Sequence, residues 1–472
     1  MPADCRQHSQ VTLGVLFALG MCNTTVAAES PATLEQIREM LQRQQEIIEQ
    51  QQDQIEALQR GRAQTTPAPV PEESADVAVS DYSAPAERRH GLSWEGYGVV
   101  NYQNYDFYEN VQDNDPERRA RTDLERIVFS PSYDFGNGYS FVAEIEFEHG
   151  GTGSTVEFEP EEAGEFESET EKGGEVVLEQ AYLQVEFVPA VNLRFGEMIV
   201  PFGMVNTHHQ PSQYFTLERS LAETHLFPSV WHETGIGMFG ELGRLRYETQ
   251  VISALDSSGF SGPYFVRDGM QGKLEFDNAD DLAFVARADY AVALGATLGA
   301  GFYIGDSTDN RPRQNLDGDA LVTLYEVHGR YERGPMIVRG QYTVGTIDNS
   351  DAVTQANQNF FNGDVLGVSR TPVGHKAQSW FAEAGYDIFS FFKNAPRGRL
   401  DLFGRYEAYN THVETEGSIA KVARYEREAG TVGVNYKPQP GIVFKAEYSS
   451  RINEGDTANE QDIYGLGFGF EF

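Results

Sequence analysis

The residues of this sequence best suited to bind a solute are arginines at alternate positions of apolar segments. Eight follow this pattern: Arg194, Arg244, Arg246, Arg287, Arg330, Arg339, Arg399 and Arg405. A guanidinium group stays charged at every physiological pH and binds carboxylate or phosphate through two parallel hydrogen bonds. The pattern therefore predicts sites for small anionic solutes, and Arg219, in a long connection between two segments, is predicted to join them.

Glutamates with the same alternate spacing come from two earlier segments: Glu144, Glu146, Glu148 and Glu186. If both sets face one water-filled lumen, a basic wall opposes an acidic wall, and the field between them orients polar solutes. Several arginines also have a carboxylate two residues away, as in Arg287 and Asp289, Arg330 and Glu332, or Arg405 and Glu407. The sequence leaves open whether the arginines bind solute or these neighbouring carboxylates.

Other chemistry has little support in this sequence. His208, His209, His225 and His232 precede Glu233 without a tight metal-ligand spacing, so we expect them to pack the connection 201–233 or to line a pore. There is no Gly-x-Ser-x-Gly or His-Glu-x-x-His motif, and either motif would point to hydrolysis. We therefore expect neither an enzyme nor a metal or other cofactor.

The elements that would position these residues are strands, because the apolar residues recur with a period of two. Sixteen segments show this pattern: 93–105, 121–135, 139–149, 176–188, 191–200, 234–241, 244–255, 283–291, 295–305, 320–333, 336–346, 378–391, 398–411, 424–437, 441–451 and 462–472. Residues 270–277 could form a further strand, which would make the total odd, so we place them in an outer loop.

The connections alternate between short and long. Tight turns are predicted at 135–138, 188–191, 241–244, 291–295, 332–335, 394–398 and 437–441, and longer connections join the remaining strands. An even number of strands, with short turns on one rim and long loops on the other, is typical of an outer-membrane barrel. A large soluble all-β protein would alternate too, but its charged face would be outside. We therefore predict a 16-stranded antiparallel transmembrane β-barrel over residues 92–472.

One face of a lipid-embedded strand must lack charge, since a Lys or Arg at mid-bilayer costs about 2–4 kcal/mol. Several segments meet this condition, including 141–147, 181–187, 380–386 and 444–448. The final segment, "GLGFGFEF", carries aromatic side chains on one face and glycines on the other. We expect its aromatic face to meet lipid and its glycines to face the lumen or to let neighbouring strands curve.

The N-terminal region differs from the rest. Residues 1–28 have the polar start, short apolar stretch and small-residue end of a secretory signal peptide, and both cysteines, Cys5 and Cys22, lie within them. Residues 32–60 show an a/d heptad series typical of a coiled coil, although a single solvated helix also fits. Residues 61–91 are rich in Pro and Ala, as in a linker.

The formal net charge of −36 argues against a nucleic-acid partner, because phosphates need a basic surface. Part of the charge is local: residues 157–171 contain many glutamates and no basic residue, as expected of a solvated loop. Binding of divalent cations or of lipopolysaccharide through such cations is the alternative interpretation of this stretch.

The stretch "LRFGEMIVPFGMVNTHHQPSQYFTLERSL" (193–221) resembles the phosphate-selective porin O/P family. The shared pattern is Gly196, Pro201, Phe202 and Gly203, followed by Phe215, Arg219 and Ser220. The resemblance covers about residues 92–472. It implies a homotrimer of outer-membrane barrels in which the third outer loop narrows each pore. The family's phosphate-selective members use an arginine ladder and a lysine cluster, whereas the connection 201–233 offers Arg219 alone.

Together these observations predict an outer-membrane porin for passive diffusion of small hydrophilic solutes, namely anions such as phosphate. Trimeric porins for small organic acids, general non-selective porins, and a structural tether or adhesin remain alternatives. The heptad segment would lie in the periplasm, and lipid and lipopolysaccharide would surround the barrel. A terminal aromatic resembles the signal that barrel-assembly machinery reads, so Phe472 is predicted to bind that machinery.

Overall fold

The fold was analysed in a computed structural model. It describes residues 91–110, 112–151, 157–158, 168–169, 174–271, 277–360, 371–457 and 459–472. All of them belong to the compact unit Val77–Phe472. The predicted signal peptide and coiled coil, and nearly all of the linker and acidic stretch, lie outside the described residues. Within the described part of the chain, no helix combines the length and apolar character that a helical membrane span requires.

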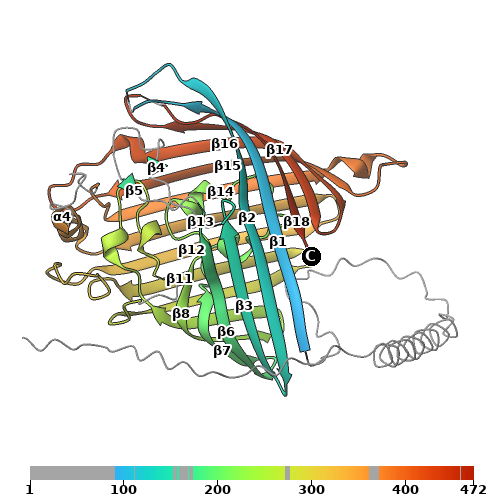
Figure 1. Cartoon of the computed structure of the whole chain (residues 1–472), viewed down its shortest axis with the longest axis horizontal. Coiled ribbons are helices and arrows are strands. Elements are labelled where there is room, and N and C mark those ends of the chain that lie inside the picture. The colour runs from blue at the N-terminus through green and yellow to red at the C-terminus, as the bar shows by residue number, and fades with distance from the viewer. Residues whose placement is uncertain are drawn as a thin grey trace, which may run out of the picture. The chain divides into compact units, whose positions relative to one another are not determined.

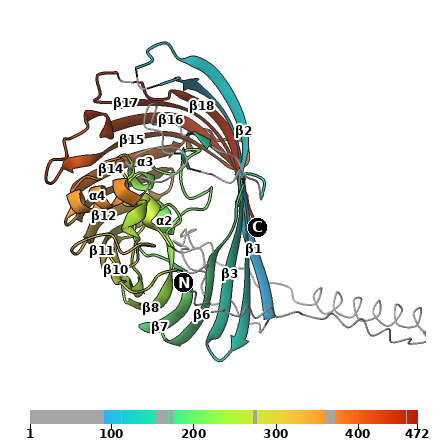
Figure 2. The same ribbon diagram turned by 60° about the vertical axis from the view of Figure 1, so that its left-hand side comes forward.

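The main body is one closed antiparallel β-barrel in which each strand pairs with its neighbours along the chain and β1 pairs with β18 (Figures 1 and 2). Its sixteen strands are β1 (Gly91–Phe107), β2 (Glu117–Gly136), β3 (Tyr139–Glu148), β6 (Val176–Val188), β7 (Val191–Ile199), β8 (His232–Leu242), β9 (Leu245–Ser253), β10 (Leu282–Ala293), β11 (Ala296–Asp306), β12 (Leu321–Arg333), β13 (Met336–Ile347), β14 (Lys376–Asp387), β15 (Arg399–Glu414), β16 (Glu426–Gln439), β17 (Ile442–Asn453) and β18 (Ile463–Glu471).

Short elements lie in the outer loops. Two-residue strands, β4 (Glu157–Phe158) and β5 (Ser168–Glu169), pair with each other between β3 and β6. The helices are α2 (Met204–Thr207), α3 (Leu221–Thr224) and α4 (Ser350–Phe360), and the 3-10 helices are η2 (Ser257–Gly259), η3 (Arg267–Gly269), η4 (Ile388–Phe391) and η5 (Ala423–Tyr425). Of these, η4 alone lies on the short-turn rim, between β14 and β15.

The tight turns of the short-turn rim are formed by residues that readily adopt positive φ. Asn137 and Gly138, between β2 and β3, both have positive φ (55° and 84°), as a two-residue hairpin turn of type I′ requires. The connection between β14 and β15 is the exception. Strand β14 ends at Asp387, whose side-chain oxygen accepts a hydrogen bond from the Phe389 N–H (3.0 Å), and η4 follows. The prediction that this strand extends to residue 391 was therefore wrong.

The outward face of the barrel is apolar, as the alternation predicted. Its exposed side chains include Phe141, Phe147, Leu183, Phe187, Trp380, Tyr386, Phe444, Tyr464, Leu466 and Phe468. The 16-stranded closed barrel is thus confirmed, with most strand ends within two residues of the predicted ones.

A buried apolar cluster fills part of the outer half of the barrel. It joins residues from the outer loops, such as Phe227, Trp231 and Phe260, to wall residues such as Val285 and Tyr303. Trp231 packs on Tyr303 with ring centroids 5.0 Å apart. The outer loops are therefore partly folded into the barrel by hydrophobic burial.

Candidate functional site: the constriction loop and its wall

The connection between β7 and β8, residues 200–231, is called here the constriction loop. Figure 2 shows its helices α2 and α3 inside the ring of strands. Its residues contact strands far from β7 and β8 in the chain, from β1, where Gln103 donates to Glu218 at 2.6 Å, to β18, where Glu471 accepts from Ser212. The loop therefore lies across the lumen and narrows it.

The wall of β13, β16 and β17 binds the backbone of the constriction loop. Five consecutive carbonyl oxygens, from residue 212 to residue 216, each accept a hydrogen bond from a wall side chain. The donors, in the order of the carbonyls, are Lys437 (2.8 Å), Arg339, Lys445 (3.1 Å), Asn435 (2.8 Å) and again Lys445 (2.7 Å). A segment of turns and bends without a strand partner needs such donors, because buried carbonyls must be hydrogen-bonded.

Wall carboxylates bind N–H groups of the same loop. Glu471 accepts from the Ser212 N–H at 2.9 Å, and Glu447 accepts from the Leu217 N–H at 2.8 Å. Glu407 accepts from the Ser220 hydroxyl (2.6 Å) and, more weakly, from the backbone N–H two residues further on (3.2 Å). Side chains of the lumen wall thus accept hydrogen bonds from N–H groups of the loop and donate hydrogen bonds to its carbonyl groups.

The loop also binds itself through Glu223. The buried carboxylate of Glu223 accepts hydrogen bonds from the backbone N–H groups of Met204, Val205 and Asn206, at 2.9 to 3.1 Å. Burial raises the pKa of Glu223 to about 7, while these hydrogen bonds act in the opposite direction. From the wall, Arg287 donates to the Gly203 carbonyl at 2.8 Å and so fixes the start of α2.

The glycines of β18 make room for the loop. A Cβ built on Gly465 or Gly467 would overlap the side chain of Leu217, and one built on Gly469 would overlap Pro211. The alternate residues of β18 point outward. Of the two expectations for these glycines, the lumen-facing one is therefore the one observed.

Six charged side chains of β12 to β15 form an alternating network behind the loop. The successive N–O distances along Arg330–Glu332–Arg339–Glu383–Arg405–Glu407 are 2.9, 3.1, 3.0, 2.7 and 3.7 Å. Arg330 and Arg339 are directly opposite across the β12–β13 pair. Their like charges are compatible because Glu332 lies between them and accepts from both.

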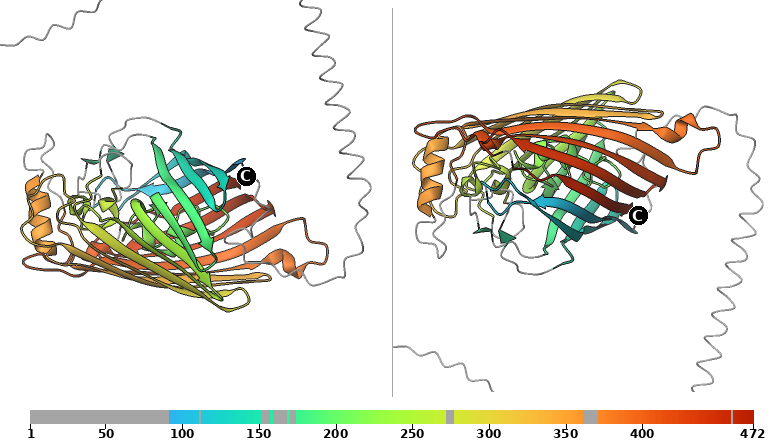
Figure 3. Two further views of the ribbon diagram at one scale, coloured as in Figure 1. Left: turned by 90° about the horizontal axis from the view of Figure 1, so that it is seen from below. Right: turned by 90° about the horizontal axis from the view of Figure 1, so that it is seen from above.

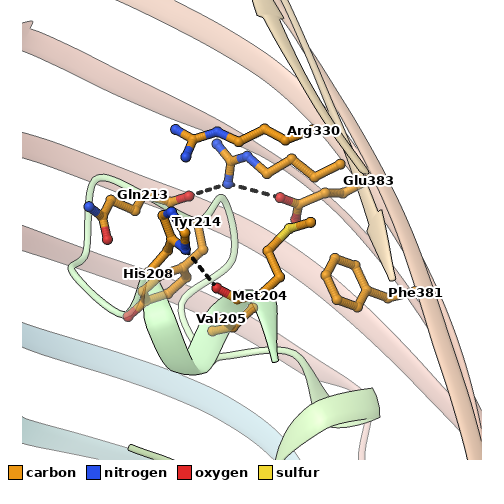
Figure 4. A pocket seen from close by; sticks show the side chains of 9 residues that line it. Met204, Val205, His208, Gln213, Tyr214, Arg330, Phe381 and Glu383 are labelled. Carbon is orange, nitrogen blue, oxygen red and sulfur yellow. Dashed lines mark hydrogen bonds and ion pairs between the residues drawn. The ribbon is translucent and has the colours of Figure 1, made fainter. Parts of the chain in front are cut away.

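A small recess lies between this network and the loop. Figure 4 shows Arg330 above the loop residues His208 and Gln213, with the neighbouring guanidinium, that of Arg339, joined to Glu383 and to the Gln213 carbonyl. Of the two arginines, Arg330 is the more accessible, with 23% of its side chain exposed against 6% for Arg339.

The other arginines predicted from strands mostly have acidic partners too. The ion pairs are Arg194–Glu248 (3.1 Å), Arg246–Glu241 (2.8 Å), Arg287–Asp289 (2.7 Å) and Arg399–Asp401 (2.7 Å). Arg244 was expected on a strand, but β9 begins one residue later. Arg244 therefore lies exposed in the β8–β9 turn at the rim and not in the lumen wall.

Arg219, on the constriction loop, has a different environment. Its Nη1 donates to the Ser229 hydroxyl at 3.1 Å, whereas its buried Nε and Nη2 have no partner. Within the described residues, no carboxylate lies within ion-pair distance of it. Its charge acts at longer range on Glu146 and Glu179 of the opposite wall. Arg219 therefore places a positive charge beside an acidic region.

The acidic wall is formed by β2, β3 and β6. Arg126 of β2, which the sequence analysis did not single out, binds Glu146 (2.9 Å) and Glu148 (3.8 Å). Glu144 lies 3.7 Å from His209 of the loop. Glu186, nearer the short-turn rim, accepts from Gln184 at 3.1 Å. The four predicted glutamates thus lie on one side of the lumen, with Arg126 among them.

His225 and His232 of the long connection are held by contacts within the protein. His225 lies between the rings of Tyr264 and Tyr409, 5.2 and 4.6 Å away, and burial holds its pKa well below the ordinary value. His232 hydrogen-bonds Glu197 at 2.7 Å. Over the described part of the chain, no three His, Cys, Asp or Glu side chains are grouped as metal ligands would be.

Comparison with known proteins gives the same architecture. A family model described as "Phosphate-selective porin O and P" matches residues 99–472. An uncharacterized protein of Aquifex aeolicus (strain VF5) is 28% identical over 365 residues, which cover 76% of each chain.

Two solved porins align with this chain. Salmonella typhi OmpF, solved in complex with daunomycin, aligns with a TM-score of 0.52 and 12% identity, over 81% of this chain and 98% of OmpF. An anion-selective porin from Comamonas acidovorans aligns with a TM-score of 0.48 and 11% identity, over 81% of this chain and all of that porin. With the closed barrel, the lumenal loop and the family match over most of its length, this chain belongs to the phosphate-selective porin O and P family and is an outer-membrane porin.

Proposed function

We propose that this porin passes small hydrophilic anions, such as phosphate or small organic acids, passively through the constriction beside residues 200–231. The observation that carries the proposal is the recess in which Arg330 and Arg339, from adjacent strands, face His208 and Gln213 of the loop. Both guanidinium groups bind Glu332, and Arg339 also binds Glu383, so the more exposed Arg330 is the cation of the recess with the better access to a solute.

Weak binding suits a channel, because a permeating ion must enter a site easily and also leave it. The ion pairs of this lumen support weak binding, since most of the guanidinium groups already have a carboxylate that competes with the solute. Among the predicted pore residues, we assign solute contact first to Arg330, beside the loop, and then to Arg246 and Arg399, whose side chains are also partly exposed. Arg194, Arg219, Arg287, Arg339 and Arg405 are buried and act on solutes through their field.

Further parts of the proposal concern assembly. We propose a homotrimer, with residues 32–60 as a periplasmic coiled coil behind a signal peptide at 1–28. We also propose Phe472 as the residue that barrel-assembly machinery recognises. Its exposed ring, next to Phe129 at 6.2 Å, supports this assignment.

The test is the reversal potential of single channels under a salt gradient in planar bilayers. We expect wild type to prefer anions and Arg330→Glu to lose that preference. Arg333→Glu, on the outward-facing alternate position of the same strand at its rim, is the matched control and should behave like wild type. An equal shift in both variants, or no shift in Arg330→Glu, would contradict the assignment of Arg330.

Permeability ratios among chloride, phosphate and a dicarboxylate then rank the solutes. A general non-selective porin would give ratios that follow free diffusion alone. Zero conductance would favour a structural tether or adhesin.

A further inference from the structure

One connection on the short-turn rim differs from its neighbours. Residues 388–398, between β14 and β15, begin with η4, whereas the other connections of this rim are tight turns. Figure 3 shows this connection, with its short helix, extending past the ends of the neighbouring strands. We call it the phenylalanine turn.

The phenylalanine turn is a folded element. Asp387 accepts hydrogen bonds from the N–H groups of Phe389 (3.0 Å) and Leu400 (3.1 Å), so it binds both ends of the turn. The Tyr436 hydroxyl of β16 donates to the Arg397 carbonyl at 3.1 Å. These bonds hold the turn against the rim in one conformation.

Its tip is apolar and exposed. Phe391 and Phe392 are 68% and 61% exposed, more than the outward-facing aromatic residues Trp380 (40%) and Tyr386 (37%) of β14. The ring of Phe391 stacks on Tyr386, with centroids 5.1 Å apart and planes at 18°. The apolar surface of the turn is therefore continuous with the lipid-facing surface of the barrel.

The turn is also basic. Lys393 and Arg397 lie within it, and no acidic residue occurs from 388 to 400, although the whole chain carries a formal charge of −36. Both side chains are exposed. Aromatic rings flanked by basic residues favour the bilayer interface, where the rings meet acyl chains and the cations meet phosphate groups.

We propose that the phenylalanine turn binds anionic phospholipids of the inner leaflet of the outer membrane. Phe391 and Phe392 enter the acyl boundary, and Lys393 and Arg397 bind lipid phosphates. The turn thereby fixes the depth of this rim in the bilayer. Lipid is favoured over a second protein because the stacked Phe391 extends a surface that already faces lipid and because the charge is complementary.

The chain's cysteine content allows a clean test. Both cysteines, Cys5 and Cys22, precede the described residues. In a full-length Cys5→Ser/Cys22→Ser background, Phe392→Cys is labelled with the environment-sensitive dye NBD. The labelled porin is reconstituted into vesicles of phosphatidylcholine alone or mixed with phosphatidylglycerol. Pro189→Cys, in the exposed β6–β7 turn of the same rim, is the matched control.

We expect blue-shifted NBD emission at position 392, quenching by spin-labelled lipid, and a stronger effect with phosphatidylglycerol. Adding Lys393→Glu and Arg397→Glu should remove the phosphatidylglycerol dependence while leaving conductance unchanged. Emission at 392 as water-like as at 189 in both vesicles would overturn the proposal. So would a blue shift that persists in detergent oligomers and disappears in monomers, which would assign the turn to a contact between copies.

Discussion

The two walls of the lumen use charge in different ways. The anchoring wall, β12 to β17, alternates arginines with carboxylates and binds the constriction loop through Lys437, Lys445 and Asn435. The acidic wall, β2, β3 and β6, places Glu146 and Glu148 beside the same arginine, Arg126. In the first wall Glu332 and Glu383 each pair with two arginines, whereas in the second two glutamates share one arginine.

This difference teaches that the number of arginines in a pore is a poor measure of its free positive charge. Most arginines of the anchoring wall neutralise neighbours or bind loop carbonyls. What reaches the solute is the field of the few groups that stay accessible, such as Arg330, whose side chain is 23% exposed. The selectivity of such a pore then depends on few groups.

The largest expected effect comes from removing Arg126, the cation that Glu146 and Glu148 of the acidic wall share. Arg126→Met leaves buried carboxylates uncompensated and should lower the free energy of unfolding by about 3–5 kcal/mol. Arg330→Met, at the accessible end of the other network, should cost about 0–1 kcal/mol. Urea unfolding of the porin reconstituted in vesicles measures both. Equal losses would show that the two walls do not differ in this way.

The next effect tests whether the anchoring wall holds the loop. Lys445→Met removes the donor of two buried carbonyls, and each unpaired carbonyl costs about 1–3 kcal/mol. We expect the loop to detach in part, so that single-channel conductance rises and open-channel noise increases. Lys376→Met removes a lysine that pairs with Glu414 at 2.9 Å at the outer end of β14, and it should leave both unchanged. Unchanged current in Lys445→Met would contradict the anchoring role.

A smaller effect tests the shared carboxylate. Glu332→Gln removes one negative charge beside Arg330 and Arg339. A unit charge about 8 Å from a permeating ion in water contributes about 0.5 kcal/mol, so the preference for anions should rise about twofold. Reversal potentials measure it, with Glu428→Gln, which bonds the outward Tyr406 hydroxyl, as control. A preference that stays constant would mean that Glu332 is remote from the ion path.

The smallest effect is a pH dependence within the loop. Because burial raises the pKa of Glu223 to about 7, the proton-bound form stabilises the buried loop. This stabilisation is complete below the ordinary glutamate pKa of about 4.3 and is lost as the pH rises through about 7. Open-channel noise should therefore increase between about pH 5 and about pH 8 in wild type and stay constant in Glu223→Gln. The same rise in both would assign the dependence to another group.

The barrel was predictable from sequence because its constraint is periodic. A bilayer demands apolar side chains at every second position, and Trp380, Phe444 and Phe468 satisfy it in the sequence as they do in space. Which residues the glycines of β18 contact in the lumen was not predictable from the sequence. It depends on where Leu217, far away in the chain, comes to lie.

Arg126 shows a second limit. The β1–β2 pairing shifts register between Val99 and Asn101, so that Val99 lies opposite Arg126 and Asn101 opposite Asp123. Counting every second residue from Arg121, whose guanidinium donates to Gln103 at 2.7 Å, would put Arg126 on the lipid face. A bulge inserts one extra residue and reverses the alternation beyond it. The sequence around this position contains no pattern that predicts the bulge.

The five bound carbonyls of the constriction loop were unpredictable for the same reason as the glycine contacts. Lys445 was recognisable as lumen-facing from its alternation, but its two acceptors lie more than two hundred residues earlier in the chain. The position of the constriction loop decides which charged side chains of the lumen contact solute and which bind loop carbonyls. The spacing of residues along the sequence does not predict that position.

The glycine row of β18 also concerns the order of assembly. Leu217 and Pro211 pack against glycines of β18, the last strand of the barrel to be synthesised. This strand pairs with β1, the first strand, so the two partners are separated by nearly the whole barrel sequence. Contacts between residues so distant in the chain form late in folding. Before β18 pairs with β1, the constriction loop would thus lack its contacts with β18 and the pore would be wide. Closing the barrel and narrowing the pore would then occur in the same step. Bulky substitutions in this row would then delay maturation as well as alter permeation.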